Sequence, residues 1–155
     1  VIPELIIGVA SLATFTILGF EMGFPTLVIA HVTFCLPFVI VNIRARIAGF
    51  DPAIEEAAMD LGATRLHTLR RVTIPMLVPG IISGALISIT LSLDDLVISS
   101  FVYGRDITFP IKVYGMVRGK VTTDVYALST LMILGTVLIY STAQLIQKRL
   151  VKERT

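Results

Sequence analysis

The sequence predicts an all-α integral membrane protein with about four membrane-spanning helices, and three observations support this class. Apolar residues make up 55% of the 155 residues and charged residues only 15%, whereas soluble domains carry about a quarter charged residues. The mean hydropathy is +0.88. Two stretches, Thr26–Ile43 and Pro75–Leu93, contain no Asp, Glu, Lys or Arg. Apolar runs of about 20 residues match the hydrocarbon core of a bilayer at the rise of an α-helix.

Four apolar segments are expected to span the membrane as a helical bundle. The first is short for a span and the chain opens abruptly in apolar sequence, so we expect upstream sequence to precede it. Polar stretches at 44–75 and 99–125 flank the third segment. The expected spans are Pro3–Phe20, Thr26–Ile43, Leu77–Ile98 and Tyr126–Gln147.

The distribution of lysine and arginine predicts the orientation of the chain. The stretch 44–75 carries five arginines, and the tail after Gln147 carries four basic residues. The outer stretch 99–125 carries four basic residues, and the turn after the first segment carries none. Because cytoplasmic loops are enriched in Lys and Arg, the loop 44–75 and the tail are both predicted to be cytoplasmic. Two spans lie between them, which is consistent with a common side.

The cytoplasmic loop is predicted to form two short helices joined by a glycine turn. Asp51 is expected to cap the first helix, with Pro52 at its first position, where no N–H is needed. Gly62 can adopt the left-handed conformation that ends a helix. Thr64 is expected to cap the second helix, and Pro75 is expected to stop it.

Residues of this loop resemble the EAA loop of ABC importer permeases. That pattern reads E-A-A, three residues, G, nine residues and then I-x-L-P. Here Glu56–Ala58, Gly62 and Val72–Pro75 stand at the same spacing, with Val72 and Ile74 as conservative replacements. A match of this length beside a membrane segment is specific.

The resemblance implies that the loop 44–75 contains the coupling helix that sits in a groove of a separate ATPase. Small side chains at Ala57 and Ala58 would permit close approach, Gly62 would set the turn, and Glu56 would pair with a basic residue. Pro75 closes the motif. The alternative is a capped helical hairpin in which Glu56 is solvated.

The third span carries two adjacent carboxylates near its outer end, Asp94 and Asp95. Charges inside a span cost a few kcal/mol each, so they usually face a cavity or a partner. They are candidates for a substrate pathway or gate that takes a cation. The alternatives are a helix break or an ion pair with a base such as Arg105. Small residues recur every four positions on this span, which favours close packing of another helix: Gly80, Gly84, Ser88 and Ser92.

Two further segments, Ser92–Val102 and His31–Val39, resemble the spermidine/putrescine permease subunits, most closely the C type. Pro110–Tyr114 and Met116–Arg118 resemble the outer loop of that subunit. The resemblance covers essentially the whole chain and implies a type I ABC importer permease of the bacterial inner membrane. It implies that residues 1–155 form one transmembrane permease domain that about two N-terminal spans precede.

The implied function is import of polyamines, driven by ATP hydrolysis in another subunit. Permeases for iron, phosphonate or thiamine are alternatives, as is an ion-coupled secondary transporter. The implied partners are an ATP-binding cassette ATPase, a second permease subunit, an extracytoplasmic substrate-binding protein and membrane lipid, with no nucleic acid.

The sequence offers no motif for catalysis or for binding a cofactor. No G-x-x-x-x-G-K-[ST] loop occurs, so ATP is expected on the partner ATPase, and no nucleophile–base arrangement supports an enzyme. His31 and Cys35 lie four apart on one helical face, but two ligands make a poor metal site. We expect a hydrogen-bonded helix contact there, and no metal.

Overall fold

The computed structural model describes residues 3–119 and 123–152, without the side chains of residues 143 and 146–152. Regular structure in this part of the chain is entirely helical, as the sequence predicts. The elements are α1 Glu4–Ile17, α2 Phe24–Ala48, α3 Ala53–Asp60, α4 Arg65–Thr68, a π-helical segment Leu69–Thr73, α5 Ile74–Asp94, α6 Val97–Val102, α7 Phe109–Gly119 and α8 Thr123–Lys152.

Among the described residues, three helices are long and apolar enough to cross a membrane. They are α2, the helix Arg65–Asp94 that contains α5, and the Thr123–Thr142 part of α8. The first expected span corresponds to α1, which is apolar but has only 14 residues. This is shorter than the roughly 20 residues that cross the hydrocarbon core.

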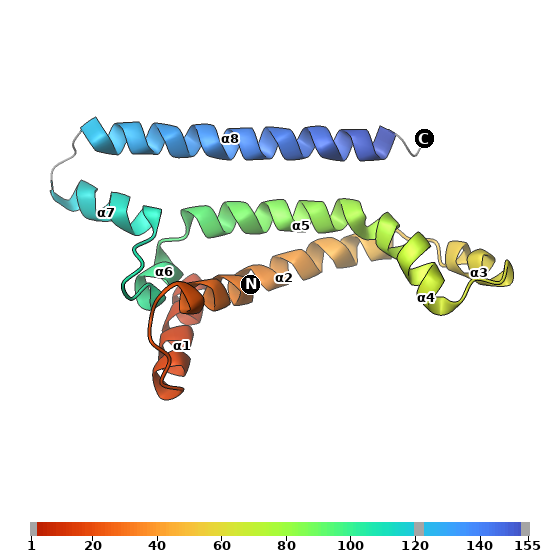
Figure 1. Cartoon of the computed structure of the whole chain (residues 1–155), viewed down its shortest axis with the longest axis horizontal. Helices are drawn as coiled ribbons and strands as arrows, with labels where there is room; N and C mark the ends of the chain where they lie inside the picture. Colours follow the sequence, from red (N-terminus) through yellow and green to blue (C-terminus); the bar gives the residue numbers. More distant parts are fainter. Residues whose placement is uncertain (1–2, 120–122, 153–155) are drawn as a thin grey trace.

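Helix α5 lies between α2 and α8 in Figure 1, with its axis roughly parallel to theirs and its chain direction opposite. The loop that contains α3 and α4 lies at the same end as the C-terminal end of α8, whereas α1, α6 and α7 lie at the other end. The prediction that the loop 44–75 and the tail share a side therefore agrees with the arrangement of the helices.

The prediction that Pro75 stops the second loop helix is wrong. Helix α4, the π-helical segment and α5 form one helix from Arg65 to Asp94, and Pro75 is the second residue of α5. Proline removes one backbone donor, and the π-helical segment directly before it changes the register of the hydrogen bonds so that the helix continues. The second loop helix is thus continuous with the third span.

The expected boundaries of the second and third spans also differ from those observed. Helix α2 extends to Ala48, where Arg46 Nε donates to the carbonyl of Met76 on α5 (3.2 Å). Helix α5 ends at Asp94, and Asp95 has an extended backbone (φ −64°, ψ 116°). The single helix expected over Leu77–Ile98 is therefore broken, and the short helix α6 follows the break.

The small residues on α5 allow another helix to pack closely, as predicted, and that helix is α2. A Cβ added at Gly84 would lie 3.1 Å from Val39 Cα, and one added at Gly80 would lie 3.1 Å from Arg46 Cβ. Cys35 Sγ donates to the carbonyl of Ser88 (3.5 Å). The absence of larger side chains on this stripe allows the two backbones to approach closely.

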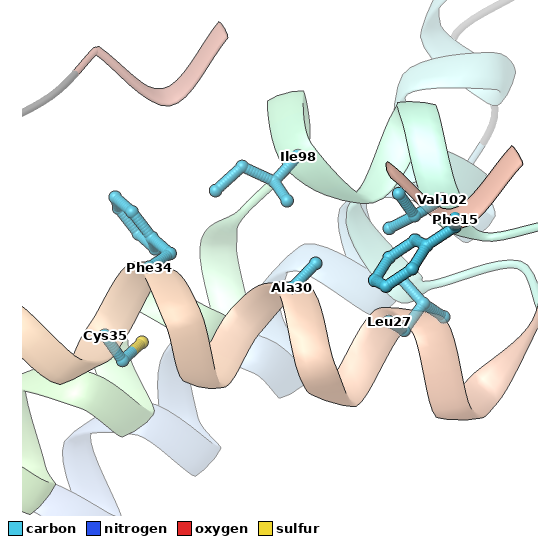
Figure 2. Close-up of a cluster of buried hydrophobic side chains, with 7 residues drawn as sticks. All are labelled: Phe15, Leu27, Ala30, Phe34, Cys35, Ile98 and Val102. Carbon is cyan, nitrogen blue, oxygen red and sulfur yellow. The ribbon is translucent and has the colours of Figure 1, made fainter. Parts of the chain in front are cut away.

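The buried apolar core lies where α1, α2 and α6 meet, at the end of the molecule opposite the loop. Side chains of α1 and α6 gather over one side of α2 (Figure 2). This packing positions α6 directly after the helix break. The core residues are Phe15, Leu27, Ala30, Phe34, Cys35, Ile98 and Val102.

Candidate functional site

The first candidate site is the segment 51–73, in which α3 is followed by a turn, α4 and the π-helical segment. We call this segment the hairpin. Asp51 Oδ1 accepts a hydrogen bond from the N–H of Ala53 (3.0 Å). Helix α3 begins at Ala53, one residue later than expected, so Pro52 rather than Asp51 occupies the capping position. Gly62 has φ +90°, the left-handed conformation predicted for the turn. Thr64 Oγ1 accepts from the N–H of His67 (3.3 Å) and caps α4 as expected. Local capping therefore determines the shape of the hairpin.

Four of the five predicted coupling residues lie together in the hairpin, and the fifth, Pro75, lies in α5. Glu56 and Ala57 are exposed on α3, Ala58 is half-buried there, and Gly62 is exposed in the turn that follows. Pro75 is half-buried within α5 instead. The carboxylate of Glu56 makes no hydrogen bond or ion pair within the described residues, so it is available to a partner.

A contact that the sequence did not reveal closes the hairpin. The Glu55 carboxylate accepts a hydrogen bond from the Thr73 hydroxyl, which ties α3 to the π-helical segment. A cavity of about 330 Å³ lies beside this contact, lined in part by Met59 and Arg65. The two bonded residues are 18 positions apart, so no short motif indicates the pair.

The hairpin exposes apolar side chains. Leu61 is 91% exposed and Leu66 is 57% exposed, although the surrounding charges predict a position outside the membrane. Groups of exposed apolar side chains with a polar surround are typical of interaction surfaces. The exposed large apolar residues of the hairpin are Ile54, Met59, Leu61, Leu66 and Leu69.

The second candidate site surrounds the break between α5 and α6. Asp95 is buried and accepts hydrogen bonds from the N–H groups of Ile98 (3.1 Å, Oδ1) and Ser99 (2.8 Å, Oδ2). Its Oδ2 lies 3.3 Å from His31 Nε2 on α2. Of the alternatives raised for the carboxylates, the helix break is present, and the basic partner of Asp95 is His31 rather than Arg105.

His31 connects three helices at this point. Its Nδ1 lies 2.7 Å from Ser92 Oγ on α5, and its Nε2 lies 2.9 Å from Ser99 Oγ on α6. We call His31, Ser92, Asp95 and Ser99 the outer cluster. The expected hydrogen-bonded helix contact is confirmed for His31.

The two adjacent carboxylates have different surroundings. Asp94 is exposed at the last position of α5, and its side chain has no hydrogen bond or ion pair within the described residues. Asp95 is buried, and both of its carboxylate oxygens accept hydrogen bonds from backbone N–H groups. Sequence reasoning treated the two residues as equivalent, and the structure makes only Asp94 accessible to a ligand.

A cavity of about 660 Å³ opens beside the outer cluster, between α2 and the segment that follows α6. His31 and Ser92 line it together with both Arg105 and Asp106, so its charge is mixed. Asp106 Oδ2 also accepts from the N–H of Phe24 (2.7 Å) and fixes the start of α2. A smaller cavity of about 300 Å³ shares His31 and Ser92 and continues along α2 and α5.

This architecture, with a capped hairpin continuous with a membrane helix, defines the class of protein. The chain belongs to the family described as the binding-protein-dependent transport system inner membrane component, which matches residues 1–153. It is a multi-pass protein of the bacterial inner membrane.

The chain is also similar in sequence to individual permease proteins of known transport systems. The chain is 43% identical to the spermidine/putrescine transport system permease protein PotC of Haemophilus influenzae over 148 residues, which is 95% of this chain and 58% of that protein. It is 48% identical to the putrescine transport system permease protein PotI of Escherichia coli strain K12 over 144 residues, 88% of this chain and 51% of that protein. The chain thus spans little more than half the length of these relatives.

A solved structure shares the fold. The inward-facing MetNI methionine ABC transporter matches with a TM-score of 0.76 and 21% identity, covering 96% of this chain and 69% of that chain. The predicted type I importer permease fold is therefore confirmed.

Proposed function

We propose that this chain forms part of the permease subunit of an ABC importer that carries polyamines across the inner membrane. Relatives 43–48% identical are named as spermidine/putrescine or putrescine permeases, which supports this substrate class. In this proposal residues 1–155 belong to a single transmembrane domain. The complete protein would work with an ATPase subunit, a second permease subunit and an extracytoplasmic binding protein.

The observation that carries the proposal is the continuous helix from Arg65 to Asp94, which joins the hairpin to the outer helix break. An ATPase that binds the exposed apolar residues of the hairpin, with Glu56 paired to a basic residue, would move this helix as a unit. The Glu55–Thr73 hydrogen bond would keep α3 attached during that motion. Movement of packed helices around a central site is a common form of alternating access.

Asp94 is the residue we propose to meet the cationic substrate. Its carboxylate is exposed at the end of a membrane helix, where an unpaired charge is costly and usually serves a pathway. Asp95 would instead maintain the helix break. ATP would bind to the partner ATPase, and this chain would hold no cofactor and catalyse no reaction.

The test is uptake of labelled spermidine and putrescine by liposomes that contain the full-length permease with its partner subunits. Uptake that requires ATP and fails in Asp94→Asn supports the proposal. ATP hydrolysis without polyamine uptake would assign the importer to another solute, such as iron, phosphonate or thiamine. Polyamine uptake without ATP would contradict the ABC mechanism and favour an ion-coupled transporter.

A further inference from the structure

The outer cluster joins α2, α5 and α6, and two of its members, Asp95 and Ser99, are buried. The Asp95 side chain is 2% exposed and that of His31 is 15% exposed. Ser99 is fully buried. Disrupting this network is costly at Asp95 and Ser99, because a buried group that loses its partner has no water to replace it.

The chemistry of the side chains determines which of them donate and which accept hydrogen bonds in the outer cluster. His31 Nε2 lies 2.9 Å from Ser99 Oγ and 3.3 Å from Asp95 Oδ2, and because an ionised carboxylate only accepts hydrogen bonds, a hydrogen on Nε2 serves both contacts. In the neutral tautomer Nδ1 is then an acceptor, and the Ser92 hydroxyl donates to it. His31 therefore connects α5, through Ser92, to the same carboxylate that caps α6.

The break between α5 and α6 depends on this connection. The extended backbone of Asp95 makes no helical turn, and its side chain supplies the acceptors for Ile98 N–H and Ser99 N–H. Asp94 immediately precedes the break. The position of its carboxylate is consequently set by the geometry that Asp95 maintains.

We propose that His31 is a positioning residue for transport: it holds the Asp95 carboxylate, fixes the break between α5 and α6, and thereby places the Asp94 carboxylate. The effect on transport rests on the proposed function, whereas the effect on the backbone does not.

Three substitutions separate the contacts of His31. His31→Gln extends an amide N–H to about the reach of Nε2 and retains a donor for Asp95 and Ser99. His31→Asn reaches only as far as Nδ1, and His31→Leu removes both contacts. Thr33→Ala is the matched control on α2, because the Thr33 hydroxyl donates to the carbonyl of Ile29 in its own helix (2.8 Å).

The first measurement is hydrogen exchange of the Ile98 and Ser99 amides in the full-length permease, reconstituted with its partners in lipid nanodiscs. His31→Leu and His31→Asn are expected to accelerate exchange by about tenfold, the effect of losing one hydrogen bond to a charged group. His31→Gln and Thr33→Ala should match the unaltered protein. Unchanged exchange in His31→Leu would overturn the proposal.

The second measurement is the concentration dependence of spermidine uptake by the same variants. His31→Asn is expected to raise KM by about tenfold with little change in maximal rate per folded transporter, and His31→Gln to restore KM. A lower maximal rate at unchanged KM would mean a merely structural role and would overturn the positioning role. If the unaltered assembly imports no polyamine, the proposed function fails, while the exchange rates still decide whether His31 holds the break.

Discussion

At the hairpin, most contacts join residues close in sequence, such as Asp51 with Ala53 and Thr64 with His67, and the Glu55–Thr73 contact spans 18 positions. At the opposite end, the decisive contacts join residues far apart in the chain. His31 and Ser92 are 61 positions apart, and Thr26 Oγ1 donates to the carbonyl of Val102 across 76 positions (2.9 Å).

The two ends also differ in burial. Thr68 is the buried residue of the hairpin within the described part of the chain, whereas the outer end contains the apolar core and the enclosed outer cluster. Local capping shapes the hairpin without a buried core. At the outer end, contacts between residues far apart in the chain hold α1, α2 and α6 together.

The largest effect is expected from Gly62→Val in the hairpin. A β-branched residue at φ +90° is strained by about 1–3 kcal/mol, so the turn should change shape. ATP-driven uptake should fall to background while the amount of permease in the membrane stays the same. Gly135→Val on α8, where an added Cβ meets nothing within 4 Å, is the control. Normal uptake by Gly62→Val would contradict a coupling role for the turn.

Asp95→Ala tests the outer end and is expected to be the most destabilising change there. The N–H groups of Ile98 and Ser99 would lose their acceptor, and His31 would lose its anionic partner. We expect a loss of about 2–3 kcal/mol, measured by thermal unfolding of the purified permease in detergent. Asp94→Ala should leave the unfolding temperature unchanged, and equal losses for the two variants would refute their different roles.

Gly84→Leu tests the contact between α2 and α5 that links the two ends. The new side chain would enter space occupied by Val39, since a Cβ alone lies 3.1 Å from Val39 Cα. Overpacking of this kind costs about 1–3 kcal/mol. The same unfolding assay should show almost no effect for Gly135→Leu, and a comparable loss for both glycines would argue against the close approach.

Asp51→Ala is expected to have the smallest effect. It removes the acceptor for the N–H of Ala53 and should destabilise α3 by about 1 kcal/mol. Because α3 is short and exposed, the change should appear as faster hydrogen exchange in residues 53–60 and as a modest decrease in uptake. Unchanged exchange there would mean that the cap contributes little.

The sequence predicts well what depends on composition and local chemistry. The apolar runs identify α2, α5 and α8, and the capping residues Asp51, Gly62 and Thr64 behave as their local chemistry requires. The small residues on α5 predict a close helix contact, which α2 supplies.

Features that depend on distant contacts were missed or misread. The helix continues through Pro75 because a π-helical segment precedes it, and proline alone does not reveal such a segment. The different surroundings of Asp94 and Asp95 depend on His31, which comes from another helix. Glu55 was overlooked beside Glu56, because its partner Thr73 is brought close only by the fold.

The most direct test of a docking role for the hairpin is photo-crosslinking from its most exposed apolar residue. A photoreactive amino acid would replace Leu61, which is 91% exposed, in the full-length permease assembled with its ATPase; Ile107, 62% exposed near the outer end, is the matched control position. We predict that position 61 crosslinks to the ATPase, with a yield that changes when ATP binds, and that position 107 does not. Crosslinking to the ATPase from position 107 but not from position 61 would contradict the proposed docking surface and the predicted orientation together.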